Sequence, residues 1–221
     1  MFDQFKNTLD TFSDEQLKEI LNIVRSKVPH PFEKRIGVEA EVILSALDRS
    51  ADITIRGIRG IIAEAIFIKS IAPYIEGWKV VEEDANDQTW DAKLQKKPTE
   101  TIINGKTVCG QIVKIQIKLQ RKEAGVPKIK DGKAIVEVQK TRTGKKHGID
   151  TRPYSFSDFD VLAVCMEPST QNWRNFKYVP SKFLKQRKKN PELIEVMQPV
   201  PFEDDEHWKS SFLDCMEVFY R

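Results

Sequence analysis

The residues best suited to chemistry are an aspartate, a glutamine and a lysine on two segments with strand character. In 111–120, apolar and polar residues alternate, so Gln116 and Lys118 project from one face of the expected strand. Asp91 lies in an earlier expected strand, 89–95. Carboxylate and amide oxygens suit Mg²⁺, and a lysine beside that ion can hold a water or help to deprotonate it. Because bound Mg²⁺ makes water more acidic and neutralises charge on phosphorus, this trio favours phosphodiester hydrolysis.

The dipeptide Asn104-Gly105 determines how these two segments are expected to pair. It is the strongest short signal for a two-residue hairpin turn. The same register, continued outward, places Asp91 opposite Lys118, with neighbouring side chains about 5 to 8 Å apart. A slip of one residue, as from a bulge at Pro98, turns Asp91 to the other face. Taken alone, an aspartate and a Gln-x-Lys pattern favour an ordinary solvent-facing strand.

Asp91 on one strand with Gln116 and Lys118 on the next resembles the PD-(D/E)xK nuclease signature, in the setting of a Type II restriction endonuclease. The resemblance covers roughly 55–179. It implies that Asp91 bridges the metal, that Gln116 replaces the second acidic ligand and that Lys118 is the catalytic lysine. It further implies Mg²⁺ as cofactor, with Mn²⁺ as a substitute, and double-stranded DNA as substrate. Trp90 stands where the motif has proline, and the neutral Gln116 makes the site less anionic than usual.

Glu64 is the residue that the resemblance implies as a further acid of the metal shell. In IRGIRGIIAEAIF, Gly57, Gly60 and Glu64 recur on one face of an expected helix. Each glycine costs about 1 kcal/mol of helix propensity relative to alanine, so two together predict close packing or a site requirement. That face is expected to meet the active sheet. A surface or salt-bridged glutamate is the alternative interpretation.

The middle of the chain is basic, although the formal net charge of the whole chain is only +3. Residues 93–152 hold sixteen Lys or Arg against five Asp or Glu, whereas 191–221 hold two against eight. A basic stretch in a folded domain predicts binding to a phosphate backbone, and a solvated lysine-rich surface is the alternative. His147 lacks a Cys or His at ligand spacing, so it is expected to contact phosphate or to be a bystander. The loop residues expected to contact DNA are Lys140, Arg142, Lys145, Lys146 and Arg152.

Hydrophobic periodicity predicts an α/β (α+β) fold, and the resemblance implies a restriction-endonuclease-like mixed central sheet flanked by helices. We expect one domain, 1–221, in which 1–72 are mostly helical, 73–180 hold the catalytic sheet and 181–221 form a C-terminal helical segment. The expected helices are 13–28, 33–46, 54–72, 182–189 and 205–219. The expected strands are 78–81, 89–95, 111–120, 134–139, 159–166 and 176–179.

The composition excludes several protein classes. With 221 residues, 40% hydrophobic and 31% charged, the chain is expected to fold around a sizeable core. Its three cysteines, Cys109, Cys165 and Cys215, support neither a disulfide framework nor a Cys-x-x-Cys zinc site. No apolar run approaches a membrane span, and the first residues lack a secretory signal, so we expect a cytoplasmic protein without a membrane partner.

Three functions remain open on the sequence. The leading one is a Type II site-specific deoxyribonuclease, expected as a homodimer because a two-fold protein matches a palindromic site. The second is a DNA repair or junction nuclease of the same fold, which would prefer DNA structure over sequence. The third is a non-catalytic nucleic-acid-binding module, favoured if the neutral Gln116 has lost the metal. Asp158 and Asp160 lie beside an apolar segment and favour a structural role, while the basic run 182–189 fits phosphate tracking and simple solvation equally well.

Overall fold

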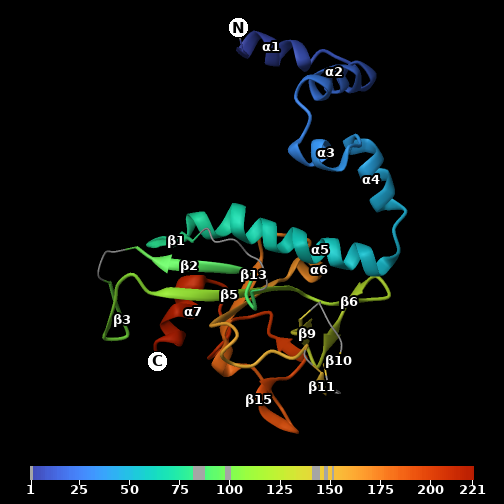
Figure 1. Cartoon of the computed structure of the whole chain (residues 1–221). Helices are drawn as coiled ribbons and strands as arrows, with labels where there is room; N and C mark the ends of the chain where they lie inside the picture. The colour runs from blue at the N-terminus through green and yellow to red at the C-terminus, as the bar shows by residue number, and fades with distance from the viewer. Residues whose placement is uncertain (1, 82–87, 98–100, 141–144, 147–148, 151) are drawn as a thin grey trace. The chain divides into compact units, whose positions relative to one another are not determined.

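A computed structural model describes residues 2–81, 88–97, 101–140, 145–146, 149–150 and 152–221 (Figure 1). The chain divides into two compact units, Met1–Arg56 and Gly57–Arg221. The single domain expected over 1–221 stays a prediction.

The N-terminal unit consists of short helices that bury almost nothing. Ser13 caps α2 through the capping box with Gln16 that the sequence predicts. The single helix expected over 33–46 is wrong, because Gly37 adopts a left-handed conformation with φ of 78° and ends α3. None of α2, α3 and α4 contains a buried residue. The helices are α1 (Phe2–Leu9), α2 (Asp14–Lys27), α3 (Pro31–Ile36) and α4 (Ala40–Asp48).

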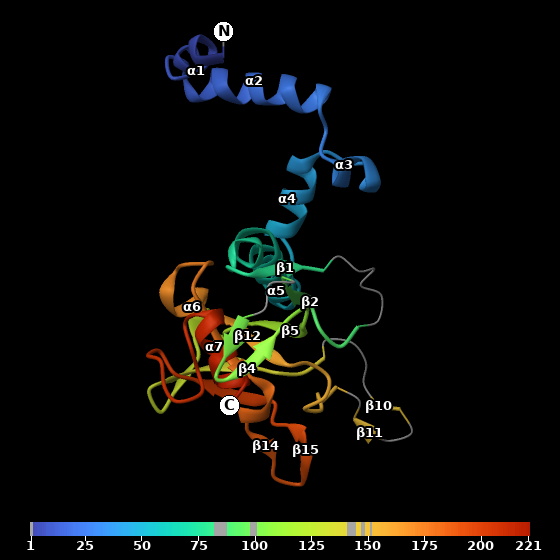
Figure 2. The same ribbon diagram turned by 90° about the vertical axis from the view of Figure 1, so that its left-hand side faces the viewer.

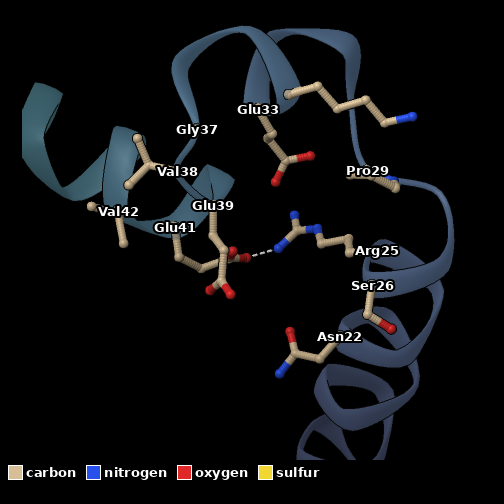
Figure 3. A pocket seen from close by; sticks show the side chains of 11 residues that line it. Asn22, Arg25, Ser26, Pro29, Glu33, Gly37, Val38, Glu39, Glu41 and Val42 are labelled. Carbon is tan, nitrogen blue, oxygen red and sulfur yellow. Dashed lines mark ion pairs between the residues drawn. The ribbon is translucent and has the colours of Figure 1, made fainter.

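A hollow of about 800 Å³ separates α2 from α3 and α4 (Figure 3). An ion pair between Arg25 and Glu41 spans it. On its wall, Glu33 accepts hydrogen bonds from the backbone N–H groups of His30 and Ala40, which hold the pKa of this exposed carboxyl below its usual range. Polar contacts rather than a hydrophobic core therefore connect these helices.

The helix expected over 54–72 is α5 (Asp52–Ile66), which continues as a π-helical segment, η1 (Phe67–Ile71). A 3-10 turn, η2 (Ala72–Tyr74), follows where Pro73 ends the helix. Ala63 and Phe67 are completely buried against the sheet. The predominantly helical first third is thus confirmed.

The central sheet is mixed and has the strand order β1-β2-β5-β12-β13. β12 pairs with β5 in parallel, and the other neighbours pair antiparallel. All five residues of β12 and of β13 are buried. The apolar sequence of β12 predicts this, whereas β13 also buries Lys177. This arrangement confirms the α/β fold class with a mixed sheet. The strands are β1 (Trp78–Val80), β2 (Ala92–Lys96), β5 (Ile112–Leu119), β12 (Val161–Cys165) and β13 (Phe176–Pro180).

The two faces of this sheet have separate hydrophobic cores. Val113, Ile115 and Ile117 of β5 pack in one core with residues of α5 and of α7 (Phe212–Phe219). Leu162 and Val164 of β12 pack in the other, with residues of a small second sheet. Figure 1 shows α5 on one side of the central sheet and β9 on the other. The second sheet has the order β16-β9-β8 and consists of β8 (Ile129–Lys130), β9 (Lys133–Glu137) and β16 (Met197–Val200).

The hairpin at Asn104-Gly105 is confirmed, but its register does not extend outward. It joins β3 (Thr101–Ile103) to β4 (Lys106–Val108). Further along, β2 and β5 pair Ala92 with Ile115, so the register has shifted by two residues. Lys96 donates its N–H to the Gln111 carbonyl, so these two residues are the last pair before the hairpin. Four residues then separate Lys96 from β3, but only two separate β4 from Gln111, and this difference produces the shift. A shift of two residues keeps every side chain on its expected face.

Residues 181–221, expected as a helical segment, form a mixed segment with 11 residues in strands and 11 in α- or 3-10 helix. The basic helix expected over 182–189 is a 3-10 turn, η3 (Ser181–Phe183), followed by a hairpin. The closing helix expected over 205–219 is the shorter α7. The hairpin consists of β14 (Gln186–Arg187) and β15 (Asn190–Ile194). The other short elements are β6 (Lys122–Glu123), β7 (Val126–Pro127), β10 (Lys145–Lys146), β11 (Ile149–Asp150) and α6 (Glu167–Thr170).

Candidate metal and nuclease site

The Asp91 carboxylate lies immediately before β2 and contacts β5. Its Oδ2 accepts a hydrogen bond from the Ile117 N–H, with N and O 2.7 Å apart, and a second from Gln116 Nε2. The Asp91 N–H donates to the Ile115 carbonyl, with N and O 2.9 Å apart. Asp91 is therefore opposite Gln116 rather than Lys118, on the face of the sheet that the sequence predicts.

Gln116 is almost completely buried, with 1% of its surface exposed. Its Oε1 has no hydrogen-bond partner within the described part of the chain. A buried polar atom without a partner costs about 1–3 kcal/mol, so this oxygen calls for an explanation. Rotating the amide by 180° would turn Oε1 toward the Asp91 carboxylate, where two oxygens repel each other. In both orientations a cation beside Oε1 would relieve the cost.

Glu64 on α5 belongs to the same electrostatic environment. Burial and then the negative charge of Asp91 raise the pKa of Glu64 to about 7, while the positive charge of Lys118 lowers it. Burial also raises the pKa of Asp91, against the lowering effects of Lys118, the Ile117 N–H and the Gln116 amide. Both carboxyl groups are thus less favourable as anions than they are in water, and a positive ion would stabilise their ionised forms.

These residues fit a hard divalent cation that keeps part of its water shell. The described residues contain no group of three or more His, Cys, Asp or Glu placed to hold a metal. A metal at Asp91 therefore depends on the Gln116 amide oxygen, on Glu64 and on waters. Mg²⁺ accepts such a set, because it binds proteins through one or two carboxylates and retains several waters.

Lys118 projects from β5 beside a second lysine and a buried tyrosine. Its Nζ lies 5.7 Å from the centre of the Tyr154 ring, and the Nζ of Lys140 lies 5.2 Å from the same centre. Lys140 also forms an ion pair with Asp158, with Nζ and Oδ2 3.3 Å apart. Burial and then the negative charges of Asp91, Asp158 and Glu64 raise the pKa of Tyr154. The tyrosine ring therefore holds two ammonium groups next to the two carboxyl groups.

The loop expected to contact DNA begins and ends at this site. The Lys140 N–H donates to the Arg152 carbonyl, with N and O 2.8 Å apart, so the two ends of 140–152 are joined. Arg152 is exposed. Arg142 and His147 lie outside the described residues. Lys145 and Lys146 form β10, which pairs antiparallel with β11.

Two expectations about neighbouring residues are changed by the structure. A Cβ atom added at Gly57 or Gly60 would meet nothing within 4 Å among the described residues, so the close packing expected there is wrong. Trp90, at the position of the motif's proline, is 9% exposed in the core that contains Tyr154, and the Lys93 Nζ lies 4.6 Å from the centre of one of its rings. A tryptophan at this position thus anchors the segment that carries Asp91.

Asp158 and Asp160 have the structural roles that their apolar surroundings favour. Asp160 accepts a hydrogen bond from the Lys114 N–H, with Oδ2 and N 2.8 Å apart. Asp158 accepts one from the Ser155 N–H at 2.9 Å, and its pairing with Lys140 also brings it to the site. Sequence reasoning missed Asp158 and Tyr154 as site residues. Their only signal was proximity in sequence to the basic loop.

Comparisons with known proteins add little to this geometry. No protein-family model matches the chain. No curated protein matches it either. One similar solved structure is a bacterial homing endonuclease, with a TM-score of 0.35 and 13% identity over 71% of this chain and 80% of that chain. At these values the similarity carries no inference about activity. No helix in the described ranges is long and apolar enough to cross a membrane.

The raised pKa of Glu64 predicts how stability depends on pH. Between pH 4.5, the ordinary value, and about 7, the folded state holds a proton that the unfolded state has lost. The free energy of unfolding therefore decreases as pH rises through this window, and Glu64→Gln removes that decrease. We expect the free energy of unfolding of the variant, measured in urea, to rise by about 1 kcal/mol relative to that of the wild type between pH 4 and pH 8. The effect is this small because solvent screens a side chain that is only partly buried.

Glu76→Gln is the matched control, because Glu76 is exposed and lies outside the site. Parallel pH profiles for the wild type and Glu64→Gln would contradict the raised pKa of Glu64.

Proposed function

We propose that this protein is a Mg²⁺-dependent Type II restriction endonuclease that hydrolyses phosphodiester bonds in double-stranded DNA. The observation that carries the proposal is the buried Asp91–Gln116 contact, with an unsatisfied amide oxygen, beside Lys118 and Glu64. An acid, an amide oxygen and an amine at one place form the donor set for a metal and the base or orienting group for a water. The support for the proposal is the geometry of these four residues.

Each residue has a distinct role in this proposal. Asp91, Gln116 and Glu64 would hold Mg²⁺, or Mn²⁺ as its substitute. The bound ion supplies positive charge to the phosphate and acidifies a water. The Lys118 ammonium orients the attacking water and stabilises the hydroxide that forms as this water loses its proton to solvent, and the partial burial of Lys118 against Tyr154 keeps the charge near the reacting atoms. The water oxygen forms a new bond to phosphorus as one ester P–O bond breaks, and the leaving oxygen takes up a proton from solvent.

The residues around the metal site supply positive charge for the DNA backbone. Lys140, half-buried, shares the Tyr154 ring with Lys118, and Arg152 lies at the other end of the same loop. Arginine and lysine neutralise phosphates and release condensed counterions. Lys145 and Lys146, on the short β10 strand within this loop, extend the proposed DNA-binding segment.

Substitutions at Asp91 and Lys118 test the catalytic assignment. Asp91→Asn and Lys118→Met keep side-chain size but remove the metal-binding charge and the amine. We expect each to reduce plasmid cleavage in Mg²⁺ by about 10³-fold or more, with duplex binding in EDTA within a few-fold of wild type, since the phosphate contacts remain. Gel analysis of the cleaved plasmid measures the rate, and discrete reproducible fragments identify site specificity.

Lys79→Met, on the exposed position of β1, is the matched control and should retain full cleavage. Cleavage at the wild-type rate by Asp91→Asn or Lys118→Met would remove the site assignment. Cuts placed by DNA structure instead of sequence would favour a repair or junction nuclease, and binding without cleavage would favour a non-catalytic module.

A homodimer is part of the proposal, because two copies related by a two-fold axis match a palindromic site. Leu17, Leu21, Val24 and Val28 recur at heptad spacing along α2 and its end, and 37–74% of their surfaces is exposed. Residues 1–56 carry ten acidic and eight basic side chains, so this surface does not suit DNA. A second copy of the same helix offers the complementary apolar seam.

The dimer is tested by changing this seam. Leu21→Lys with Val24→Lys would place like charges where the two helices meet. We expect light scattering to give twice 25.5 kDa for the wild type and 25.5 kDa for the double variant. Glu19→Lys, on another face of α2, should leave the dimer intact. A wild-type monomer at tens of micromolar, or a dimeric double variant, would contradict the proposal.

A further inference from the structure

The hairpin β14–β15 extends away from the body of the protein (Figures 1 and 2). Its strands are joined by a turn at Lys188 and Lys189, and a register irregularity lies between Gln186 and Arg187. The base of the hairpin is fixed. The buried Gln198 side chain accepts a hydrogen bond from the Lys185 N–H at 2.9 Å and donates one to the Lys185 carbonyl at 3.0 Å.

The base of this hairpin is directly connected to the candidate site. The Ile194 N–H at the end of β15 donates to the Tyr154 carbonyl, with N and O 2.8 Å apart. A bridge pairs Leu193 with the adjacent Ser155. Ile194 is completely buried in the core that contains the Tyr154 ring. Because that ring contacts Lys118 and Lys140, the hairpin begins next to the proposed reaction centre.

The hairpin carries an unusual concentration of unpaired positive charge. Within the described part of the chain, no ion pair involves its four basic residues. Three of these side chains are exposed, and the fourth, of Arg187, has a buried Nε without a hydrogen-bond partner. Residues 185–194 contain a single acid, Glu192, although the following segment is acidic. The four basic residues are Lys185, Arg187, Lys188 and Lys189.

The shape and chemistry of the hairpin match one ligand class. A two-stranded ribbon fits the major groove of B-DNA, which is about 12 Å wide. Lysines at the turn neutralise phosphates, and a guanidinium presents a planar fork to guanine. No large apolar side chain of the hairpin is exposed, so it lacks the hydrophobic centre that a protein interface or a membrane surface needs.

We propose that residues 185–194 form a DNA-reading ribbon that enters the major groove beside the candidate cleavage site. Lys185, Lys188 and Lys189 contact phosphates, and Arg187 reads a base edge. The location of the ribbon relative to a scissile bond rests on the proposed function, whereas its binding to duplex DNA does not.

The salt dependence of DNA binding tests the phosphate contacts. Fluorescence anisotropy with a random 40-base-pair duplex in EDTA, between 50 and 300 mM NaCl, gives the slope of log K against log salt. We expect a triple variant, Lys185→Gln, Lys188→Gln and Lys189→Gln, to lose about 2 to 3 from the size of this slope and about tenfold to hundredfold in affinity at 150 mM NaCl. The matched control, Lys69→Gln, Lys79→Gln and Lys106→Gln, should keep the wild-type slope. Those three lysines are also exposed but lie on other elements.

Should the triple variant fold poorly, the double variant Lys188→Gln and Lys189→Gln repeats the measurement at the exposed turn, with a loss of slope of about 1 to 2. A slope equal to that of the wild type in a folded variant would overturn the proposal.

Arg187→Lys tests base reading, because it keeps the charge and loses the fork. From a pool of randomised duplexes, the wild type should select a guanine-containing motif that Arg187→Lys no longer enriches, with an unchanged salt slope. Selection of the same motif by both proteins would contradict the role of Arg187.

The ribbon and the nuclease proposal can fail separately. If the wild type cleaves plasmid and the ribbon variants bind DNA normally, the nuclease proposal is supported and the ribbon proposal is contradicted. A wild type that binds through the ribbon without cleaving supports the ribbon and contradicts the nuclease proposal.

Discussion

The candidate site depends on the burial of one carboxylate. Asp91 is held on β5 by the Ile117 N–H and the Gln116 amide, in surroundings that raise its pKa. Two hydrogen bonds offset part of the desolvation of the anion, and the positive Lys118 offsets more. Glu64, whose pKa is also raised, adds a second acid that burial disfavours as an anion. The unsatisfied Oε1 of Gln116 adds an oxygen without a partner. A divalent cation would satisfy all three groups at once, which is why the metal is central to the proposed function.

The central sheet brings Asp91 and Gln116 together. Alternation along β5 places Gln116 and Lys118 on one face and Ile115 and Ile117 in the opposite core. The face with Gln116 would normally be exposed in an antiparallel sheet. Here it is covered by the core that includes Tyr154 and by the hairpin base at Ile194. The same covering buries the amide, positions Lys118 against an aromatic ring, and brings the basic hairpin to the edge of the site.

Periodicity and turn chemistry predicted the parts of the fold that depend on local sequence. The capping box at Ser13, the turn at Asn104-Gly105 and the alternation in β5 are all confirmed. The predicted face of Asp91 is correct although the register was wrong, because a shift of two residues is one full period of a strand. Residues 182–189 were misread as a helix, since a lysine-rich run has good helix propensity and its hairpin structure depends on pairing with β15 and on the bonds between Lys185 and Gln198. Tyr154 and Asp158 had no pattern of their own, because their place in the site is set by chain folding.

The most direct test is a crystal structure of the wild-type protein soaked in Mn²⁺, with anomalous diffraction to locate the ion. We predict one strong anomalous peak within about 2 Å of an Asp91 carboxylate oxygen and of Gln116 Oε1, and no such peak in crystals of Asp91→Asn. A wild-type crystal in millimolar Mn²⁺ with no peak at Asp91, or with its peaks elsewhere, would contradict the account.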